Sequence, residues 1–314
     1  MKSEAKSNHE ILKLVEISKL YYEKNYTQAR IADIMEISRP LVSKLLAEAR
    51  TFGIVKIEIK SPIQNDALLM EKLSRKYNLE GGMIVPTGTG DKNISQHVLI
   101  SQGAQYIKQQ ISSLNYIGLG WGYTMGGLVD ELKPLKNEQR KNGHVFPIVG
   151  SASNDIKWYQ PNELTRIFAS KTGYLPHYLH APAFPMTLES KKLFEDTQEY
   201  QETLSLWHKM DAVVVGVGIY PSVPDQATAA RFGTILKEKK GVGMIATYYY
   251  DEQGHFIESP DDIVIRIPLD ALERTKVILI VGSGERKISS VRGALMTGIV
   301  SQIVIDDQTA NELI

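Results

Sequence analysis

The sequence of 314 residues contains no cysteine. A disulfide framework, a thiolate nucleophile and a cysteine-bound metal are therefore excluded. Long apolar runs are also missing, because runs such as residues 212–217 and 277–281 have the length of a strand and are too short to cross a bilayer. The polar residues 1–9 lack the apolar segment of a signal peptide, so we expect a cytoplasmic protein.

An excess of charge of one sign is absent as well. The chain has 36 lysines and arginines against 36 aspartates and glutamates, and its mean hydropathy of −0.19 is ordinary for a globular protein. Residues 1–60 hold eleven basic and eight acidic side chains, so this part leans mildly towards a polyanionic partner. Charge alone does not indicate DNA binding.

Residues 1–60 have the pattern of a small helical domain. Apolar residues recur at helical spacing within residues 11–22, 29–35 and 41–49, and Gly53 is suited to end the third helix. Residues 54–60 then alternate between apolar and charged side chains, which predicts a short half-buried strand. Three helices followed by a strand is the order of a winged helix-turn-helix, so we assign residues 1–60 to such a DNA-binding domain.

The second and third helices have the local features of a helix-turn-helix. Ser38 is a good N-cap for the third helix, and Pro40 falls in its first turn, where a missing N–H carries no cost. Ala32 is small where the two helices are expected to cross. Glu36 occupies the tight-turn position usually taken by glycine, at a cost of about 1 kcal/mol for a left-handed residue with a Cβ. The alternative is a plain helical bundle with charged faces, but these features together favour DNA binding.

The third helix is expected to enter the major groove with its N-terminal end. Arg39 is the best candidate to contact a guanine, because its guanidinium fork matches two acceptors of that base. Phosphate contacts, which position the protein, are expected from Thr27, Gln28, Lys44 and Arg50. Lys56 and Lys60 on the wing are further candidates for such contacts. The predicted DNA-binding residues are Thr27, Gln28, Ser38, Arg39, Pro40, Ser43, Lys44 and Arg50.

Residues 61–314 have the pattern of one large α/β domain, which we assign to effector binding and oligomerisation. A connecting amphipathic helix is predicted over residues 66–77, and short apolar runs then alternate with helical stretches. Such alternation predicts a Rossmann-like fold with a largely parallel sheet. The predicted strands are residues 82–85, 116–119, 144–149, 212–217, 243–246, 263–267, 277–281 and 301–305.

Two glycine-containing loops that follow predicted strands are suited to bind an anion. In residues 120–124, glycines let backbone N–H groups approach an anion, and the helix that follows adds a favourable dipole. In residues 281–287, Lys287 brings a positive charge, and both loops are expected at the carboxyl edge of the sheet, as are residues 216–218. The alternative is that these glycines only make turns. The predicted effector-binding residues are Gly120, Trp121, Gly122, Tyr123, Thr124, Gly150, Ser151, Gly284 and Lys287.

Neither a cofactor nor a metal is expected. Gly118, Gly120 and Gly122 do not have the spacing of the dinucleotide-binding fingerprint. The histidines do not fall at metal-ligand spacing on one helix, and Trp158 and the tyrosines at 248–250 are expected in the core or in a subunit interface.

Short motifs along both domains carry a resemblance to a known family. They lie at residues 21–22, 26–28, 31–32, 37–40 and 42–46 of the first domain and at 118–124, 179–183, 241–243, 251–254, 287–290 and 305–310 of the second. Together these motifs resemble the SorC family of sugar-binding bacterial transcriptional regulators. The resemblance covers nearly the whole chain in the expected order. It implies an effector domain similar to sugar-phosphate isomerases, and homotetramers or dimers of dimers that are released or rearranged when the effector binds. It also implies that Lys287 and residues 120–124 hold the effector's phosphate.

The same resemblance locates two departures from the family pattern. Where one kind of family member carries a lysine that forms a Schiff base with a sugar aldehyde, this chain has Val149, so that covalent route is excluded. Where many members carry an aspartate that binds a sugar hydroxyl, this chain has Met244. Asn154, Asp225 and Gln226 are the candidate substitutes for the missing sugar contact.

The sequence therefore predicts a DNA-binding transcription regulator, with operator DNA and a small phosphorylated sugar or related metabolite as its partners and no membrane association. The alternative is an enzyme of the sugar-phosphate isomerase or deaminase kind fused to a helix-turn-helix. We find no general base beside the glycine loops, which favours the non-enzymatic interpretation. A DNA-binding structural protein without an effector is disfavoured by the two anion-binding loops.

Overall fold

The computed structural model describes residues 8–55, 65–86, 92–134, 143–152, 156–221, 231–280 and 287–314. The chain divides into two compact units, Met1–Pro62 and Ile63–Ile314. The boundary predicted from the sequence was residue 60.

The first unit is a helical bundle that contains a helix-turn-helix. It comprises α1 (Asn8–Ser18), a π-helical turn (Lys19–Glu23), α2 (Gln28–Ile34) and α3 (Arg39–Thr51). Buried apolar side chains from all three α-helices form its core, and Ala32 lies within that core as expected for a close crossing of helices. The fully or nearly buried members of this core are Ile17, Ile31, Ala32, Val42 and Leu46.

Local capping decides where these helices begin and end. The Ser38 hydroxyl accepts a hydrogen bond from the Leu41 amide at 3.4 Å, and Pro40 lies in the first turn of α3. Glu36 has a φ of +51° and Gly53 a φ of +71°, so both adopt the left-handed conformations predicted from their positions. The predicted wing strand falls largely on residues 56–60, which lie outside the described residues.

The second unit is built on a twisted parallel sheet. In the described residues its strands follow the order β1-β9-β8-β5-β2-β3-β4. All neighbouring pairs in this order are parallel. The bounds are β1 Gly81–Val85, β2 Tyr116–Leu119, β3 His144–Pro147, β4 Leu175–Pro176, β5 Ala212–Ile219, β8 Lys276–Ile280 and β9 Val300–Asp306.

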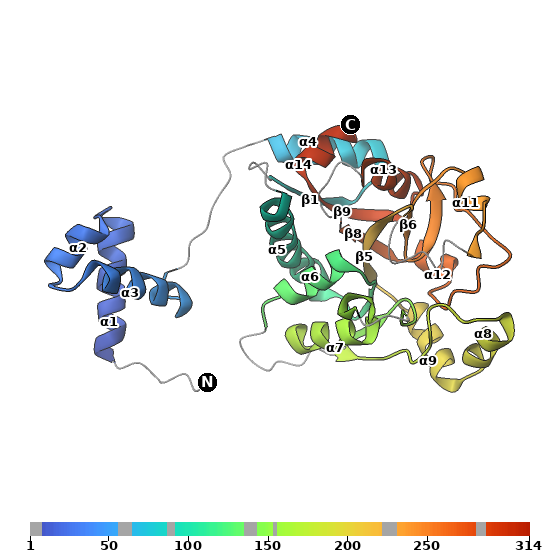
Figure 1. Ribbon diagram of the computed structural model, residues 1–314, viewed down its shortest axis with the longest axis horizontal. Helices are drawn as coiled ribbons and strands as arrows, with labels where there is room; N and C mark the ends of the chain where they lie inside the picture. Colours follow the sequence, from blue (N-terminus) through green and yellow to red (C-terminus); the bar gives the residue numbers. More distant parts are fainter. Residues whose placement is uncertain are drawn as a thin grey trace. The chain divides into compact units, whose positions relative to one another are not determined.

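Helices cover both faces of this sheet (Figure 1). Alternate residues of β5 point to opposite faces: Ala212 and Val214 pack in one apolar cluster, and Val213 and Val215 in the other. One cluster contains α5 (Lys92–Gln110), α6 (Tyr123–Glu131) and α7 (Pro161–Thr172). The other contains α4 (Asn65–Tyr77), α9 (Gln198–Trp207), α12 (Leu269–Glu273), α13 (Ile288–Met296) and α14 (Asp307–Glu312).

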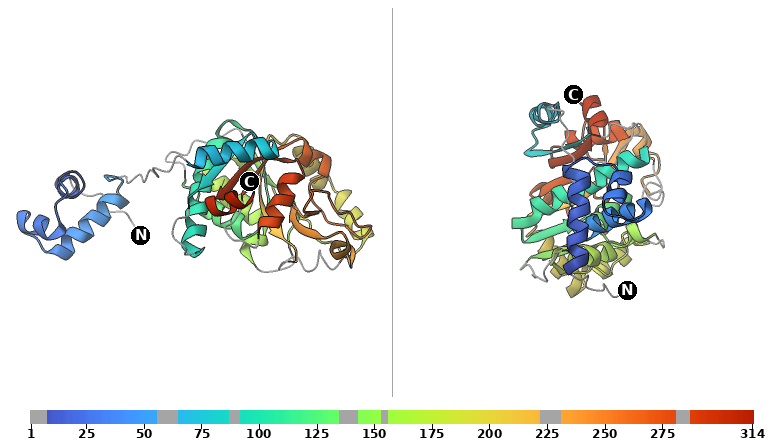
Figure 2. Two further views of the ribbon diagram at one scale, coloured as in Figure 1. Left: turned by 90° about the horizontal axis from the view of Figure 1, so that it is seen from above. Right: turned by 90° about the vertical axis from the view of Figure 1, so that its left-hand side faces the viewer.

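The two ends of this unit's chain meet on one face of the sheet. Helix α4 lies beside the C-terminal helix α14 (Figure 2). The Tyr77 hydroxyl donates to the carbonyl of Leu313 at 2.9 Å, and the Lys76 ammonium donates to the same carbonyl. The unit is thus closed by contacts between its first helix and its last.

Two of the predicted strands differ in the structure: one is antiparallel and the other is not a strand. Strand β6 (Gly241–Ile245) is antiparallel to β5 and forms a hairpin with β7 (Tyr248–Asp251), which places Tyr249 and Tyr250 in the core. Residues 263–267 do not form a strand; they run alongside the end of β3 with one isolated bridge, Arg266 to Val149. Their apolar pattern reflects burial of Val264, Ile265 and Ile267 without a regular ladder.

The order of the strands creates a switch point between β2 and β5. From β2 the chain continues through β3 and β4 in one direction, and it then returns to the other side of β2 with β5 and continues through β8 to β9. Connections on either side of such a point leave a crevice at the carboxyl ends of the strands, where ligands bind in open α/β sheets. Among the described helices, none is long and apolar enough to cross a membrane.

Candidate DNA-recognition helix and ligand pocket

Helix α3 exposes its polar face along its whole length. Arg39, Ser43 and Arg50 follow one another at helical spacing on one side, and all are exposed. Val42, Leu46 and Ala49 occupy the opposite side and are buried. Thr27, Ser38, Pro40 and Lys44 are exposed as well, and Gln28 is half-buried. The structure therefore leaves every predicted DNA-binding side chain at least partly accessible.

Charge is concentrated on this exposed face but is not uniform. The Lys44 ammonium lies 4.0 Å from a Glu48 carboxylate oxygen, one turn further along α3. An exposed pair at this distance contributes little to stability, so Lys44 can exchange this partner for a phosphate. The Arg30 guanidinium stacks over the Tyr26 ring at 4.0 Å and adds another exposed cation at the start of α2.

A pocket of about 210 Å³ lies at the switch point between β2 and β5. Residues of the β2–α6 loop line one side and residues 215–219 of β5 line its floor. The end of β3, the β6–β7 hairpin, Tyr159 and Lys287 complete the described lining. The lining residues among the predicted effector contacts are Gly120, Trp121, Gly122, Tyr123, Thr124 and Lys287.

The two glycines of the β2–α6 loop serve the backbone in different ways. A Cβ added to Gly120 would lie 3.1 Å from Val215 Cγ1, a tight contact where β2 and β5 meet. Gly122 has a φ of +110°, a conformation that side chains disfavour. The backbone conformation of the loop therefore favours glycine at residue 122, and close packing favours a small residue at 120.

The amides of these glycines are already engaged within the protein. The Gly120 amide donates to the Val214 carbonyl at 2.9 Å, and the Gly122 amide donates to the Trp158 carbonyl at 2.8 Å. These two amides are therefore not the free donors of the loop. The first hydrogen bond of α6 runs from Gly126 to Gly122, so the amides of Tyr123 and Thr124 in its first turn have no acceptor within the helix.

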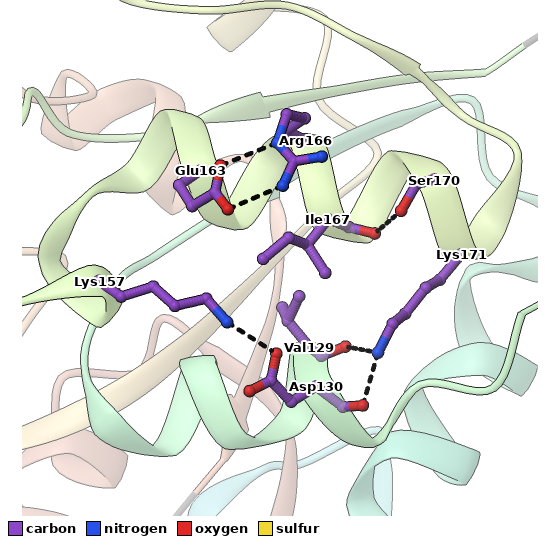
Figure 3. A network of polar contacts seen from close by, with 8 residues as sticks. All are labelled: Val129, Asp130, Lys157, Glu163, Arg166, Ile167, Ser170 and Lys171. Carbon is purple, nitrogen blue, oxygen red and sulfur yellow. Dashed lines mark hydrogen bonds and ion pairs between the residues drawn. The ribbon is translucent and has the colours of Figure 1, made fainter. Parts of the chain in front are cut away.

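Helix α6 is fixed at its C-terminal end by two lysines (Figure 3). The Lys171 ammonium, from α7, donates to the carbonyls of Val129 (3.0 Å) and Asp130. The Lys157 ammonium donates to the Asp130 carboxylate at 3.3 Å. Positive charge at the C-terminus of a helix is favourable. These contacts hold the helix in place while its N-terminus borders the pocket.

Lys287 precedes α13 and provides the fixed positive charge of the pocket. Burial lowers the pKa of Lys287, and the negative charge of Asp306 opposes this shift. A half-buried ammonium gains most from an anionic partner in the same pocket, because the partner offsets the cost of desolvation. The helix terminus and this cation together make the pocket suited to a phosphate.

The chain is similar to known proteins over nearly its whole length. Residues 61–314 match the family model Sugar-bind, described as "Putative sugar-binding domain". The deoxyribonucleoside regulator of Bacillus subtilis is 28% identical over 96% of both chains, and the sorbitol operon regulator of Klebsiella pneumoniae is 26% identical over 98% of this chain and 99% of its own. The crystal structure of the full-length sorbitol operon regulator SorC of K. pneumoniae superposes with a TM-score of 0.77 at 26% identity, covering 98% of this chain and 99% of that chain.

The chain belongs to the SorC family. Its relatives are transcriptional regulators, and its large unit is the sugar-binding domain of that family. The predicted resemblance and the predicted fold class are therefore confirmed.

The two departures from the SorC family pattern both lie in the pocket. Val149 and Met244 line it, together with Ile148. Met244 packs against Gly218, where an added Cβ would come within 2.6 Å of its methyl carbon. Val149 and Met244 are thus apolar residues of the pocket lining.

Other predicted residues stand apart from the pocket or cannot be placed. Gly150 and Ser151 are absent from the described lining. A Cβ on Gly150 would lie 2.6 Å from the Ala181 oxygen and the Ala183 nitrogen, and Ser151 bridges to Pro182, so these two residues pack backbone against backbone. Asn154, Asp225, Gln226 and Gly284, like the wing residues Lys56 and Lys60, lie outside the described residues.

Several lining residues were not predicted from the sequence, among them Ala246 and Thr247 at the tip of the β6–β7 hairpin. The sequence carries no glycine or asparagine there to indicate a two-residue turn. Tyr159 was missed as well, since it follows a segment without a strand signal. Only the return of β6 against β5 brings the hairpin tip to the switch point.

Proposed function

We propose that the chain is a DNA-binding transcription regulator whose operator binding is controlled by a small phosphorylated sugar or related metabolite. One observation supports the ligand class above all: the N-terminus of α6 and the half-buried Lys287 line one pocket at the switch point of the sheet. Two independent sources of positive potential favour a phosphate over a neutral sugar.

The phosphate subsite would use main-chain and side-chain groups together. The first-turn amides of α6 and the Thr124 hydroxyl would donate to phosphate oxygens, and the Lys287 ammonium would neutralise their charge. The apolar wall of Val149 and Met244 would face the sugar. Because residue 149 has no amine, the effector would bind without a covalent bond from that position.

The DNA-binding surface would be α3 with the start of α2. Arg39 would contact a guanine edge in the major groove, and Thr27, Gln28, Lys44 and Arg50 would contact phosphates. Ser38, Pro40 and Ser43 at the exposed start and side of the helix would face the groove. Working on chromosomal DNA, such a regulator would be cytoplasmic.

Control would follow from linkage between the two sites. If the effector and the operator favour different arrangements of a homo-oligomer, such as a dimer of dimers, each weakens the other's binding by the same factor. The names of the sorbitol operon and deoxyribonucleoside regulators support control of this kind by a sugar-derived molecule.

We favour binding without turnover over an enzyme. The ionisable side chains in the described lining are Lys287, Tyr123 and Tyr159, and none has a general base beside it among these lining residues. The regulatory names of the relatives favour the same interpretation.

The test begins with selection of binding sites from random duplex DNA by the full-length protein. Fluorescence anisotropy on the selected site is then repeated with Arg39→Ala and with Arg75→Ala, an exposed arginine on α4, as the control. We expect Arg39→Ala to cost about 1–3 kcal/mol of specific binding and to relax the preference at one base pair. Titration of glucose 6-phosphate, fructose 6-phosphate, ribose 5-phosphate and 2-deoxyribose 5-phosphate into the complex tests control. Failure of every phosphorylated sugar to change DNA affinity or melting temperature would refute the effector proposal.

A further inference from the structure

The tip of the β6–β7 hairpin has an unusual backbone for its residues. Ala246 and Thr247 join the strands with φ values of +48° and +65°. A two-residue turn with both central residues at positive φ favours asparagine and glycine, and a β-branched residue there is an outlier. Strained backbone of this kind concentrates at functional sites. Both residues line the same pocket as Lys287.

The tip also has hydrogen-bond donors without acceptors. Thr247 is only 2% exposed, yet neither its amide nor that of Ala246 donates to any acceptor among the described residues. The Thr247 hydroxyl donates to the Ala246 carbonyl at 2.6 Å. Buried backbone N–H groups without partners are rare in folded proteins. Donors of this kind in a pocket wall are available to an oxygen of a ligand.

The side chain of Arg266 holds the backbone of the hairpin tip. Its guanidinium donates to the Thr247 carbonyl at 2.7 Å and lies over the Tyr248 ring at 3.6 Å. It also forms an ion pair with Asp262, and the two side chains are only 10% and 12% exposed. The backbone of Arg266 bridges to Val149, which lines the pocket. Arg266 thus contacts two separate parts of the pocket wall.

The Asp262–Arg266 pair is a poor source of stability. The second carboxylate oxygen of Asp262 is buried and has no hydrogen-bond partner within the described part of the chain. Replacing a buried ion pair by apolar residues is often neutral or stabilising, because the pair loses its hydration. What the pair does provide is one fixed position for the carbonyl of Thr247.

We propose that the hairpin tip binds the effector, with the amides of Ala246 and Thr247 donating to a hydroxyl or carbonyl oxygen of its sugar part, and that Arg266 is the positioning residue for this contact. The inference rests on the proposed function, in which Lys287 and the N-terminus of α6 bind the phosphate of a sugar phosphate. It supplies a polar contact for the sugar at the end of strand β6, which also carries the lining residue Met244.

The test replaces the buried pair as a whole and separates the two subsites. Asp262→Leu/Arg266→Met removes both charges with apolar side chains of similar size. The control is Asp270→Leu/Arg274→Met, which removes an exposed pair of the same spacing on α12. Binding of inorganic phosphate and of glucose 6-phosphate, fructose 6-phosphate, ribose 5-phosphate and 2-deoxyribose 5-phosphate is measured by isothermal titration calorimetry on the full-length protein.

We expect the tightest of the four sugar phosphates to bind the Asp262→Leu/Arg266→Met protein at least 5-fold more weakly. The affinity for inorganic phosphate should stay unchanged, and the control should match the wild-type protein. Unchanged affinity for the sugar phosphate in a folded variant would overturn this inference alone. Absence of binding of all five probes to the wild-type protein would overturn the proposed function and this inference with it.

A second measurement needs no variant. In ¹⁵N-labelled wild-type protein, the amide resonance of Thr247 should shift on addition of the sugar phosphate and remain in place with inorganic phosphate. A Thr247 resonance that does not respond to the sugar phosphate would contradict the proposed contact.

Discussion

The two proposed binding regions of this protein are constructed in opposite ways. The proposed DNA-binding surface is α3 with the start of α2, and its groove-facing residues Ser38, Arg39 and Ser43 lie close together in the sequence. The pocket collects its lining from β2, β3, β5, the β6–β7 hairpin and the start of α13, which span more than half of the chain. The first region depends on caps and turns, and the second on the order of strands.

This difference has a consequence for mutation. On α3, a surface substitution removes one contact and leaves the fold intact, because the buried side of the helix is untouched. In the pocket, a lining residue is held by neighbours from other segments, as Thr247 is held by Arg266. We therefore expect substitutions at residues such as Arg266 to alter binding without contacting the ligand.

The largest effect is expected from the core of the first unit. Leu46→Ala should destabilise the helix-turn-helix by about 2–5 kcal/mol, because Leu46 is 3% exposed in a small core. Scanning calorimetry should show a lower transition for the N-terminal unit and an unchanged transition for the large one. Leu41→Ala on the same helix, where the leucine is 36% exposed, is the control. A shift of both transitions by Leu46→Ala would contradict this prediction.

The next largest effect separates charge from fold in the pocket. Lys287→Met should weaken binding of sugar phosphates by about 10–100-fold, as expected for loss of a charged hydrogen bond. Its melting temperature should stay level or rise, because burial lowers the pKa of Lys287 and the folded state no longer has to desolvate an ammonium. Calorimetric titration and thermal unfolding check both effects, with the exposed Lys209→Met as the control. Equal affinity in the two variants would exclude Lys287 from the phosphate subsite.

A third prediction concerns a glycine that the sequence assigned to the ligand. Gly150→Ala should cost about 1–3 kcal/mol of stability, because its Cβ would meet backbone atoms of residues 181–183 at 2.6 Å. Gly103 lies in helix α5, and a Cβ there would lie 3.4 Å from Val304 Cγ1, an ordinary contact. Gly103→Ala should therefore raise the free energy of unfolding by about 0.5–1 kcal/mol. Urea unfolding measures both. A Gly150→Ala protein of normal stability that fails to bind ligand would restore the original assignment.

The smallest expected effect is a pH dependence of stability. It concerns two histidines near the start of β3, at the edge of the sheet opposite to the pocket. Burial lowers the pKa of His177 from its usual 6.5, and the neighbouring His144, whose Nδ1 lies 2.8 Å from His177 Nε2, acts in the same direction. The unfolded chain therefore takes up a proton as the pH falls below 6.5 while the folded chain resists it, so stability decreases there. His177→Gln should flatten this decrease in melting temperature between pH 6.5 and 5, and the exposed His97→Gln should leave it unchanged. Identical slopes for all three proteins would contradict the assignment.

Much of the fold could be predicted from local patterns. The caps at Ser38 and Gly53 and the left-handed Glu36 were predicted because each depends on a few neighbouring residues. The parallel strands around β5 were predicted from their apolar runs and the glycines that follow. The antiparallel β6 and the irregular residues 263–267 were not, since an apolar run does not reveal its partner strand.

The sequence by itself determined the helix-turn-helix and the α/β class of the large unit, because caps and hydrophobic periodicity act over short distances. That Lys287 and residues 120–124 line one pocket depends on the order of the strands. Only the tertiary structure decided that Gly150 packs against residues 181–183, that the amides of Gly120 and Gly122 are already bonded, and that Thr247 faces the pocket with Arg266 behind it. Those outcomes depend on which strand lies beside which. That order is fixed by burial of the whole sheet between two helical layers.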